Sequence, residues 1–137
     1  MNTEQESNKW VVRQLIEEAI NRGNFEVVDR LIADQLVEHD PHQVAGASPR
    51  QAFIDAVNVF RQAFPDQQTV VDEQVAEGDR VATRWHMTGT HSGTFMGIAA
   101  TGRRVNLAGI FWDRLKDGRM VETWANYDLF GLIQQIR

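Results

Sequence analysis

A change in hydrophobic period near Pro65 divides the sequence into two parts. Before it, apolar residues recur at the i, i+3, i+4 spacing of amphipathic helices. After it, apolar and polar residues alternate, which is the spacing of half-buried β-strands. The turns between the later segments are too short for the crossovers that parallel strands need. The order therefore predicts an α+β fold with helices first and an antiparallel sheet second.

Three helical segments are predicted before Pro65, at about residues 7–22, 25–33 and 49–64, and residues 1–7 are expected to form a tail. Residues 36–41 are expected to be a short extended piece that enters a loop. The third helix has the best-marked start, because Ser48 is a good N-cap, Pro49 suits the first helical position and Gln51 completes a capping box.

Four strands are predicted after Pro65, at about residues 69–77, 80–91, 103–115 and 119–128, with a short closing helix or tail over residues 130–136. Together the elements predict three N-terminal helices packed on a curved four-stranded antiparallel sheet. Long strands bent around a helical layer would form a cone-shaped α+β barrel with an internal pocket. The length of 137 residues fits a single domain over residues 1–137.

Composition excludes several classes of protein. The net charge of -5 and the lack of a Lys/Arg cluster argue against nucleic acid as a partner. No apolar run approaches the ~20 residues of a membrane span, and the acidic, polar first residues do not resemble a signal peptide. The absence of cysteine excludes disulfides and thiolate metal sites, and makes the cytoplasm the default location.

The predicted last strand, residues 117–128, has the chemistry of a pocket wall. A regular strand would place one set of side chains on one face: Met120, Glu122, Trp124, Asn126 and Asp128. That face mixes two large apolar side chains with three polar groups. Such a mixture suits a mostly apolar pocket with a few placed polar groups.

Short motifs along nearly the whole chain carry a family resemblance. They include EHDP at residues 38–41, FPD at 64–66, EGDRVA at 77–82, GTHSGTFMG at 89–97, DGRMVETW at 117–124 and DLFGL at 128–132. Together they resemble the SnoaL-like polyketide cyclase (ester cyclase) family of the nuclear-transport-factor-2-like superfamily. The resemblance implies a curved antiparallel sheet wrapped on helices, often as a homodimer through the sheet.

The resemblance also implies an activity and a catalytic residue. The cyclases of this family close a ring in a polyketide ester by intramolecular aldol condensation, without metal or cofactor. An aspartate after the Trp of the last strand is their acid/base group, and Asp128 matches it. They also use a pocket histidine on the preceding strand. Residues 103–115 contain no histidine, and the positions are taken by Asn106, Ala108, Ile110 and Trp112.

Two residues are therefore candidates for catalysis. Asp128 would be a carboxylate facing a largely apolar cavity, where desolvation raises a carboxyl pKa. The alternative is that Asp128 caps the following helix. His39 matches a family position near the pocket mouth and could assist Asp128, or it could be a loop-tethering histidine.

The predicted ligand is a small hydrophobic or aromatic compound, because four Trp residues in so short a chain favour a cavity for a ring-shaped molecule. The predicted substrate-binding residues are Trp10, Phe60, Phe64, His91, Phe95, Trp124 and Asn126. For most of the aromatic residues, ordinary core packing is the alternative. For His91 the alternative is a structural role in the glycine-rich loop at residues 92–102. Glu122 is expected to form a salt bridge with Arg84 or Arg103.

No metal is expected, because the spacing of His39, Asp40, His42 and Asp128 matches no metal-site signature. Two functions stay open. The first is a cofactor-independent enzyme that acts on a carbonyl or ester compound by Asp-mediated cyclisation or isomerisation. The second is a non-catalytic ligand-binding or dimerisation domain of the same fold.

Overall fold

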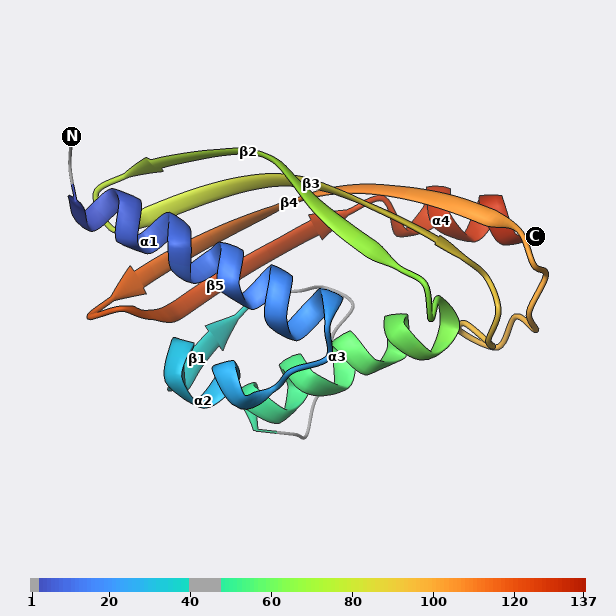
Figure 1. Cartoon of the computed structure of the whole chain (residues 1–137), viewed down its shortest axis with the longest axis horizontal. Helices are drawn as coiled ribbons and strands as arrows, with labels where there is room; N and C mark the ends of the chain where they lie inside the picture. The colour runs from blue at the N-terminus through green and yellow to red at the C-terminus, as the bar shows by residue number, and fades with distance from the viewer. Residues whose placement is uncertain (1–2, 40–47) are drawn as a thin grey trace.

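The computed structural model describes residues 3–39 and 48–137. Its elements follow the predicted order of helices and then strands except for one strand, Ile32–Glu38, which lies between two of the helices (Figure 1). They are α1 (Thr3–Gln14), η1 (Leu15–Asn21), α2 (Glu26–Leu31), β1 (Ile32–Glu38), α3 (Pro49–Ala63), β2 (Gln68–Glu77), β3 (Arg80–Thr90), β4 (Arg104–Lys116), β5 (Arg119–Tyr127) and α4 (Leu129–Ile136). Among the residues so described, no helix is long and apolar enough to cross a membrane.

The sheet has five strands in the order β1-β5-β4-β3-β2, one more than the four predicted. The three hairpin pairs β2–β3, β3–β4 and β4–β5 are antiparallel, as expected. The additional strand β1 pairs parallel with β5. The last residues of β1, 36–38, were expected to be extended, but its start was expected to be helical. The reason is that α2 passes directly into β1 at Ile32, where the sequence carries no glycine or proline to mark the change.

The curved sheet covers α1 and α3, which lie on the same side of it, while α4 lies at the end where β5 finishes (Figure 1). The sheet does not close into the barrel that we expected, because β1 and β2 stand at opposite ends of the strand order. The architecture is therefore an open, curved sheet with helices on its concave side.

The first helical segment ends where predicted, with Arg22 as C-cap, but differs in its start and in its second half. α1 begins at Thr3, so residues 3–7, which we expected to be a tail, are helical. After Gln14 the chain continues as the π-helix η1. Its buried residues Leu15, Ile16 and Ala19 pack in the core with Val11 and Val12 of α1.

The N-cap and the first residue of α3 are as predicted, but the Gln51 side chain bonds forward along the helix. The hydroxyl of Ser48 accepts a hydrogen bond from the backbone N–H of Gln51 at 3.2 Å, and Pro49 is the first helical residue. The side chain of Gln51 donates to Asp55 at 2.8 Å. The helix stops at Ala63, directly before the Phe64-Pro65 pair.

A β-bulge in β5 reverses the predicted faces of the last strand. Arg114 pairs with Glu122 but the next residue, Leu115, pairs with Met120, so Val121 is an extra residue. Beyond the bulge the inward side chains are Thr123, Ala125 and Tyr127. Our expectation of one face carrying Met120, Glu122, Trp124, Asn126 and Asp128 is therefore wrong, because alternation changes parity at an inserted residue.

Candidate functional site

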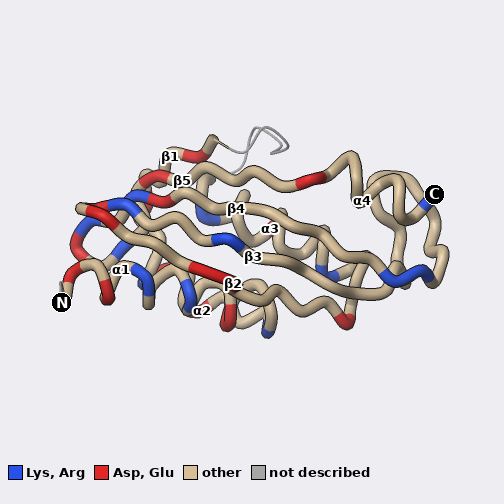
Figure 2. Tube along the Cα trace, turned by 90° about the horizontal axis from the view of Figure 1, so that it is seen from above, with Lys and Arg blue, Asp and Glu red and all other residues tan. Residues whose placement is uncertain are grey.

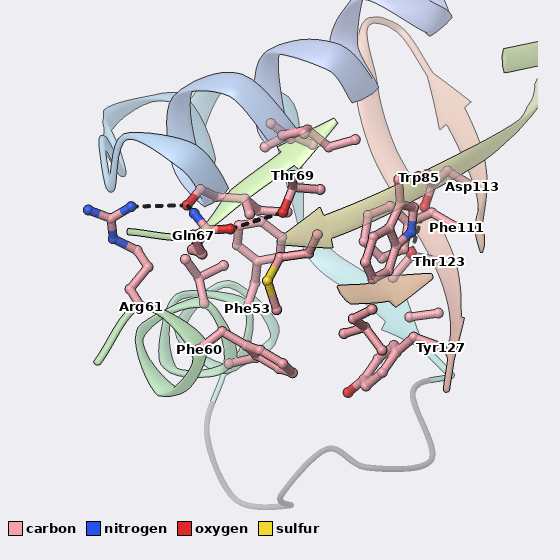
Figure 3. Close-up of a pocket in the computed structure, with 18 of the residues that line it drawn as sticks. Phe53, Phe60, Arg61, Gln67, Thr69, Trp85, Phe111, Asp113, Thr123 and Tyr127 are labelled. Atoms are coloured by element: carbon pink, nitrogen blue, oxygen red, sulfur yellow. Dashed lines mark hydrogen bonds between the residues drawn. The ribbon is translucent and has the colours of Figure 1, made fainter. Parts of the chain in front are cut away.

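A cavity of about 140 Å³ lies between the concave face of the sheet and the helices α3 and η1 (Figure 3). Its wall is mostly apolar and aromatic, with contributions from Phe53, Phe60, Trp85, Met87, Phe111 and Tyr127. A cavity of roughly 150 Å³ with an apolar lining can hold benzene. The space is thus sufficient for one ring of a small ligand.

The carboxyl group of Asp113 lies in this wall and is only 1% exposed. Its Oδ1 accepts a hydrogen bond from the hydroxyl of Thr123 at 2.5 Å. Its Oδ2 has no hydrogen-bond partner among the described residues. A buried carboxyl with one unpaired oxygen is costly to keep ionised, which makes it unusual in a core that serves only for stability.

Burial raises the pKa of Asp113 to about 7. The negative charge of Glu38 raises the pKa further, whereas the hydrogen bond from Thr123 lowers it. A carboxyl group with a pKa near 7 can both accept and donate a proton at neutral pH. The cavity wall therefore contains a carboxyl group whose pKa suits general acid/base chemistry.

Glu38 is a second carboxyl group in the cavity wall. It ends β1 and stands opposite Thr123 of β5 in the parallel register. Thr123 in turn bonds Asp113 of β4. Three neighbouring strands thus bring Glu38, Thr123 and Asp113 together, although the residues are far apart in the sequence.

Trp85 contributes the third unusual polar group. Its ring packs against Phe111, with ring centroids 4.9 Å apart, and the residue is 5% exposed. Its indole nitrogen has no acceptor among the described residues. Figure 3 shows Trp85, Asp113 and Thr123 at one end of the cavity and Arg61 and Gln67 at the other.

The polar groups at the Arg61 end are already paired. The hydroxyl of Thr69 donates to Gln67 at 3.0 Å, and the amide of Gln67 donates to the carbonyl of Ile20 at 2.8 Å. Arg61 donates to the carbonyls of Ile20 and Asn21 at 3.1 and 2.7 Å. Unpaired polar atoms therefore lie at the Asp113 end, where a ligand could satisfy them.

Asp128, our predicted catalytic residue, is exposed and does not belong to the cavity lining. Its carboxylate accepts a hydrogen bond from the backbone N–H of Gly131 at 2.9 Å and caps α4. The capping role, which the sequence left open, is the role that its contacts show.

His39 lies on the opposite face of the sheet from the cavity. Its ring stacks on Trp124 with centroids 4.6 Å apart, and its Nε2 lies 2.8 Å from Glu122. Glu122 also accepts a hydrogen bond from Arg114 at 2.6 Å. The salt bridge of Glu122 is therefore with Arg114, and not with Arg84 or Arg103 as we expected. Asp40 and His42 lie outside the described residues.

Of the seven residues predicted to bind substrate, Phe60 lines the cavity and the other six do not. Trp10 is 53% exposed. Phe64 and Phe95 are buried in the core beside Phe60. His91 is buried in the loop, where its Nδ1 accepts the backbone N–H of Thr101 at 3.2 Å. Trp124 and Asn126 come after the bulge and alternate with the inward residues, so they lie on the outer face of the sheet.

The family model of the SnoaL-like polyketide cyclases matches residues 10–136. The chain belongs to this family. Among curated proteins none matches.

Solved structures of similar proteins support the SnoaL-like fold. IdmH from Streptomyces antibioticus is 33% identical with a TM-score of 0.81, over 93% of this chain and 96% of its own. AclR from Streptomyces galilaeus is 27% identical with a TM-score of 0.83, over 96% of both chains. A protein from Jannaschia sp. CCS1 is 22% identical with a TM-score of 0.87, over 99% of this chain and 95% of its own, and shows the fold alone.

The SnoaL-like resemblance led us to look for a histidine on the wrong face of β4. Asn106, Ala108, Ile110 and Trp112 are all exposed and alternate with the inward side chains. Asp113 belongs to the inward set, with Val105, Leu107, Phe111 and Leu115. The signal was present in the sequence, because one aspartate interrupts an otherwise apolar or glycine series of alternate residues.

Proposed function

We propose that this SnoaL-like protein is an acid/base enzyme that acts on a small hydrophobic carbonyl or ester compound. Asp113 is the group that removes and returns the proton, in an aldol-type cyclisation or an isomerisation. One observation carries the proposal: Asp113 is a buried, half-satisfied carboxyl group with a raised pKa in the wall of a ring-sized cavity.

The chemistry needs one proton transfer at a time. The ionised Asp113 takes a hydrogen from the carbon next to a carbonyl, and the electron pair of that C–H bond moves toward the carbonyl oxygen. The resulting enolate carbon attacks a second carbonyl carbon of the same molecule, and the alkoxide that forms takes the proton back from Asp113, which returns to its ionised form. In an isomerisation, the protonated Asp113 returns the proton to a different carbon.

The environment of Asp113 suits this cycle. The apolar wall keeps water away from the enolate, and the raised pKa leaves similar amounts of acid and base near pH 7. Family membership supports carbonyl chemistry as the substrate class. It does not decide the reaction, because AclR is described only as a candidate hydroxylase and IdmH only as a candidate polyketide cyclase.

The proposal can be tested without knowledge of the natural substrate, by measuring proton exchange in model ketones. Small aromatic ketones such as acetophenone and 2-indanone are incubated with the protein in D₂O, and loss of the α-hydrogen NMR signal measures proton abstraction. We expect Asp113→Asn to reduce the protein-dependent exchange at least roughly 100-fold. Asp128→Asn is the matched control, because Asp128 caps α4 outside the cavity lining.

Three outcomes distinguish the alternatives. Exchange that depends on Asp113 but not on Asp128 supports the proposal. Equal exchange in the wild type and Asp113→Asn contradicts it. Thermal stabilisation by these ketones without any exchange favours the ligand-binding domain instead.

A further inference from the structure

We infer that the indole N–H of Trp85 donates the hydrogen bond that holds the carbonyl or enolate oxygen of the bound compound. This inference rests on the proposed function for the identity of the oxygen. It adds the group that binds this oxygen and the class of molecule that the cavity selects, which is a planar ring bearing an enol, phenol or carbonyl oxygen.

The first observation is an unpaired donor in a buried place. Trp85 is 5% exposed, yet its Nε1 has no partner in the described part of the chain. Buried tryptophans usually place this N–H on an acceptor, and leaving such a donor unpaired in the core is destabilising. An acceptor supplied by a ligand would remove that penalty.

The second observation is a platform that fixes the indole. Trp85 of β3 stands opposite Gly109 of β4. A Cβ at position 109 would lie 2.4 Å from Cζ2 and 2.8 Å from Cε2 of Trp85, far inside van der Waals contact. Only glycine lets the ring lie this close to the backbone of β4, so the direction of the N–H is set before any ligand arrives.

Neighbouring rings hold the indole from its other sides. Its centroid lies 4.9 Å from that of Phe111 and 6.2 Å from that of Tyr127. A planar ligand in the same cavity would meet aromatic faces and edges, which favour offset or edge-to-face contact with another ring.

The third observation is an unpaired acceptor at the same end of the cavity. Oδ2 of Asp113 has no partner among the described residues, and Figure 3 shows Asp113 and Trp85 at the same end of the cavity. A single ligand oxygen that carries a hydrogen can accept from Trp85 and donate to Asp113. A carbonyl compound with an acidic α-hydrogen also offers both groups, because its oxygen can accept from Trp85 and its α-hydrogen can be taken by Asp113. This arrangement selects enolisable ketones, enols and phenols over plain hydrocarbons.

Phenol and toluene form a matched pair of probes, because both are single rings of similar size and only phenol carries the oxygen. Trp85→Phe is the matched variant, since it keeps an aromatic ring and removes the N–H. Titration calorimetry should show that the wild type binds phenol about ten-fold more tightly than toluene. In Trp85→Phe this preference should fall several-fold while toluene affinity changes little. An unchanged preference would overturn the inference.

A second measurement is made on the protein with Trp85 intact, so it does not depend on the folding of Trp85→Phe. The ¹⁵N–¹H signal of the Trp85 indole, assigned by its proximity to the Gly109 α-hydrogens, should move downfield with phenol but not with toluene. Trp124→Phe is the control, because Trp124 stacks on His39 away from the cavity. A signal that responds equally to both probes would contradict the inference.

The two proposals can fail separately. If exchange depends on Asp113 but the preference for phenol over toluene is unchanged in Trp85→Phe, only the role of Trp85 is overturned. A Trp85-dependent phenol preference without exchange of any ketone would support the oxygen site and contradict proton transfer by Asp113.

Discussion

Asp113 of β4 and Glu122 of β5 belong to neighbouring residue pairs of the two strands but lie on opposite faces of the sheet, in opposite environments. On the inner face, burial raises the pKa of Asp113 to about 7. On the outer face, hydrogen bonds from His39 and then Arg114 lower the pKa of Glu122. Asp113 pairs with Thr123, and the next pair along the two strands is Arg114 with Glu122. The pleat of the sheet therefore decides which carboxylate is ionised and paired, and which is available for proton transfer.

The outer face pairs its charges with one another. Arg114 bonds both Glu122 and Asp79, and Asp72 lies 2.9 Å from His86. Acidic and basic positions are interspersed along the sheet (Figure 2). On the inner face, the cation among the described lining residues is Arg61, at the far end from Asp113 (Figure 3). Without a nearby cation, burial dominates the pKa of Asp113.

The outer face also bears exposed apolar side chains. Val70, Ile110 and Trp112 are each close to half exposed. This is the surface through which the family resemblance implies a homodimer. The dimer stays a prediction, and sedimentation of the protein with and without Trp112→Glu would test it.

The largest difference between the faces should be seen in the pH dependence of stability. The pKa of Asp113 is 3.8 when unfolded and about 7 when folded, so the folded state holds the proton more tightly and loses stability as pH rises from about 4 to 7. The upward shift in the pKa of Asp113 corresponds to a loss of roughly 4 kcal/mol in the free energy of unfolding over this pH range. Urea unfolding should show Asp113→Asn gaining stability relative to wild type by an amount of that order between pH 4 and pH 8.

Glu122→Gln is the outer-face counterpart, with the opposite sign. Because the folded pKa of Glu122 is lowered from 4.5, its stabilising effect is present above about pH 4.5 and lost as pH falls through the folded pKa. Glu122→Gln should therefore be less stable than wild type at pH 8 but not in strong acid. The same pH trend in both variants would contradict the contrast between the faces.

The next largest effect should come from Gly109→Ala. The added Cβ would meet Trp85 at 2.4 Å and the backbone oxygen of Asn126 at 2.9 Å, so the indole must leave its place. We expect destabilisation of about 1–3 kcal/mol and a weaker preference for phenol. The control is Ala108→Ser on the outer face, which should change stability by less than about 0.5 kcal/mol. Equal destabilisation by Gly109→Ala and Ala108→Ser would contradict the close packing of Trp85 on Gly109.

The smallest effect should come from Thr123→Val, which removes the hydroxyl that bonds Asp113 and keeps the shape. Since that hydrogen bond lowers the pKa of Asp113, the pKa should rise above its wild-type value. Stability should fall by about 1 kcal/mol at high pH. Thr123→Ser retains the hydroxyl and should stay close to wild type. A titration that Thr123→Val leaves unchanged would show that the bond does not act on Asp113.

Local patterns were enough to predict α3 and the three hairpin-linked strand pairs. Ser48 and Pro49 mark a helix start through backbone chemistry, and Gly78 and Gly118 adopt the positive φ of tight turns. These signals act over a few residues, so a single sequence contains them.

The candidate site depended on contacts that no local pattern shows. The bulge at Val121 reverses the inward parity of β5, and with it Glu122 and Trp124 turn away from the cavity. The pairing of β1 with β5 brings Glu38 to Thr123 across 85 positions of sequence. Asp113 could have been found from the apolar alternation of β4, whereas its partner Glu38 could not.

The proposed function requires above all that Asp113 changes its protonation near neutral pH. A ¹³C NMR titration of the aspartate side-chain carboxyl carbons, with the Asp113 signal identified by its absence in Asp113→Asn, measures it without knowledge of the substrate. We expect a midpoint near pH 7 for Asp113, displaced when phenol occupies the cavity. A midpoint at or below its ordinary value of 3.8 would contradict it.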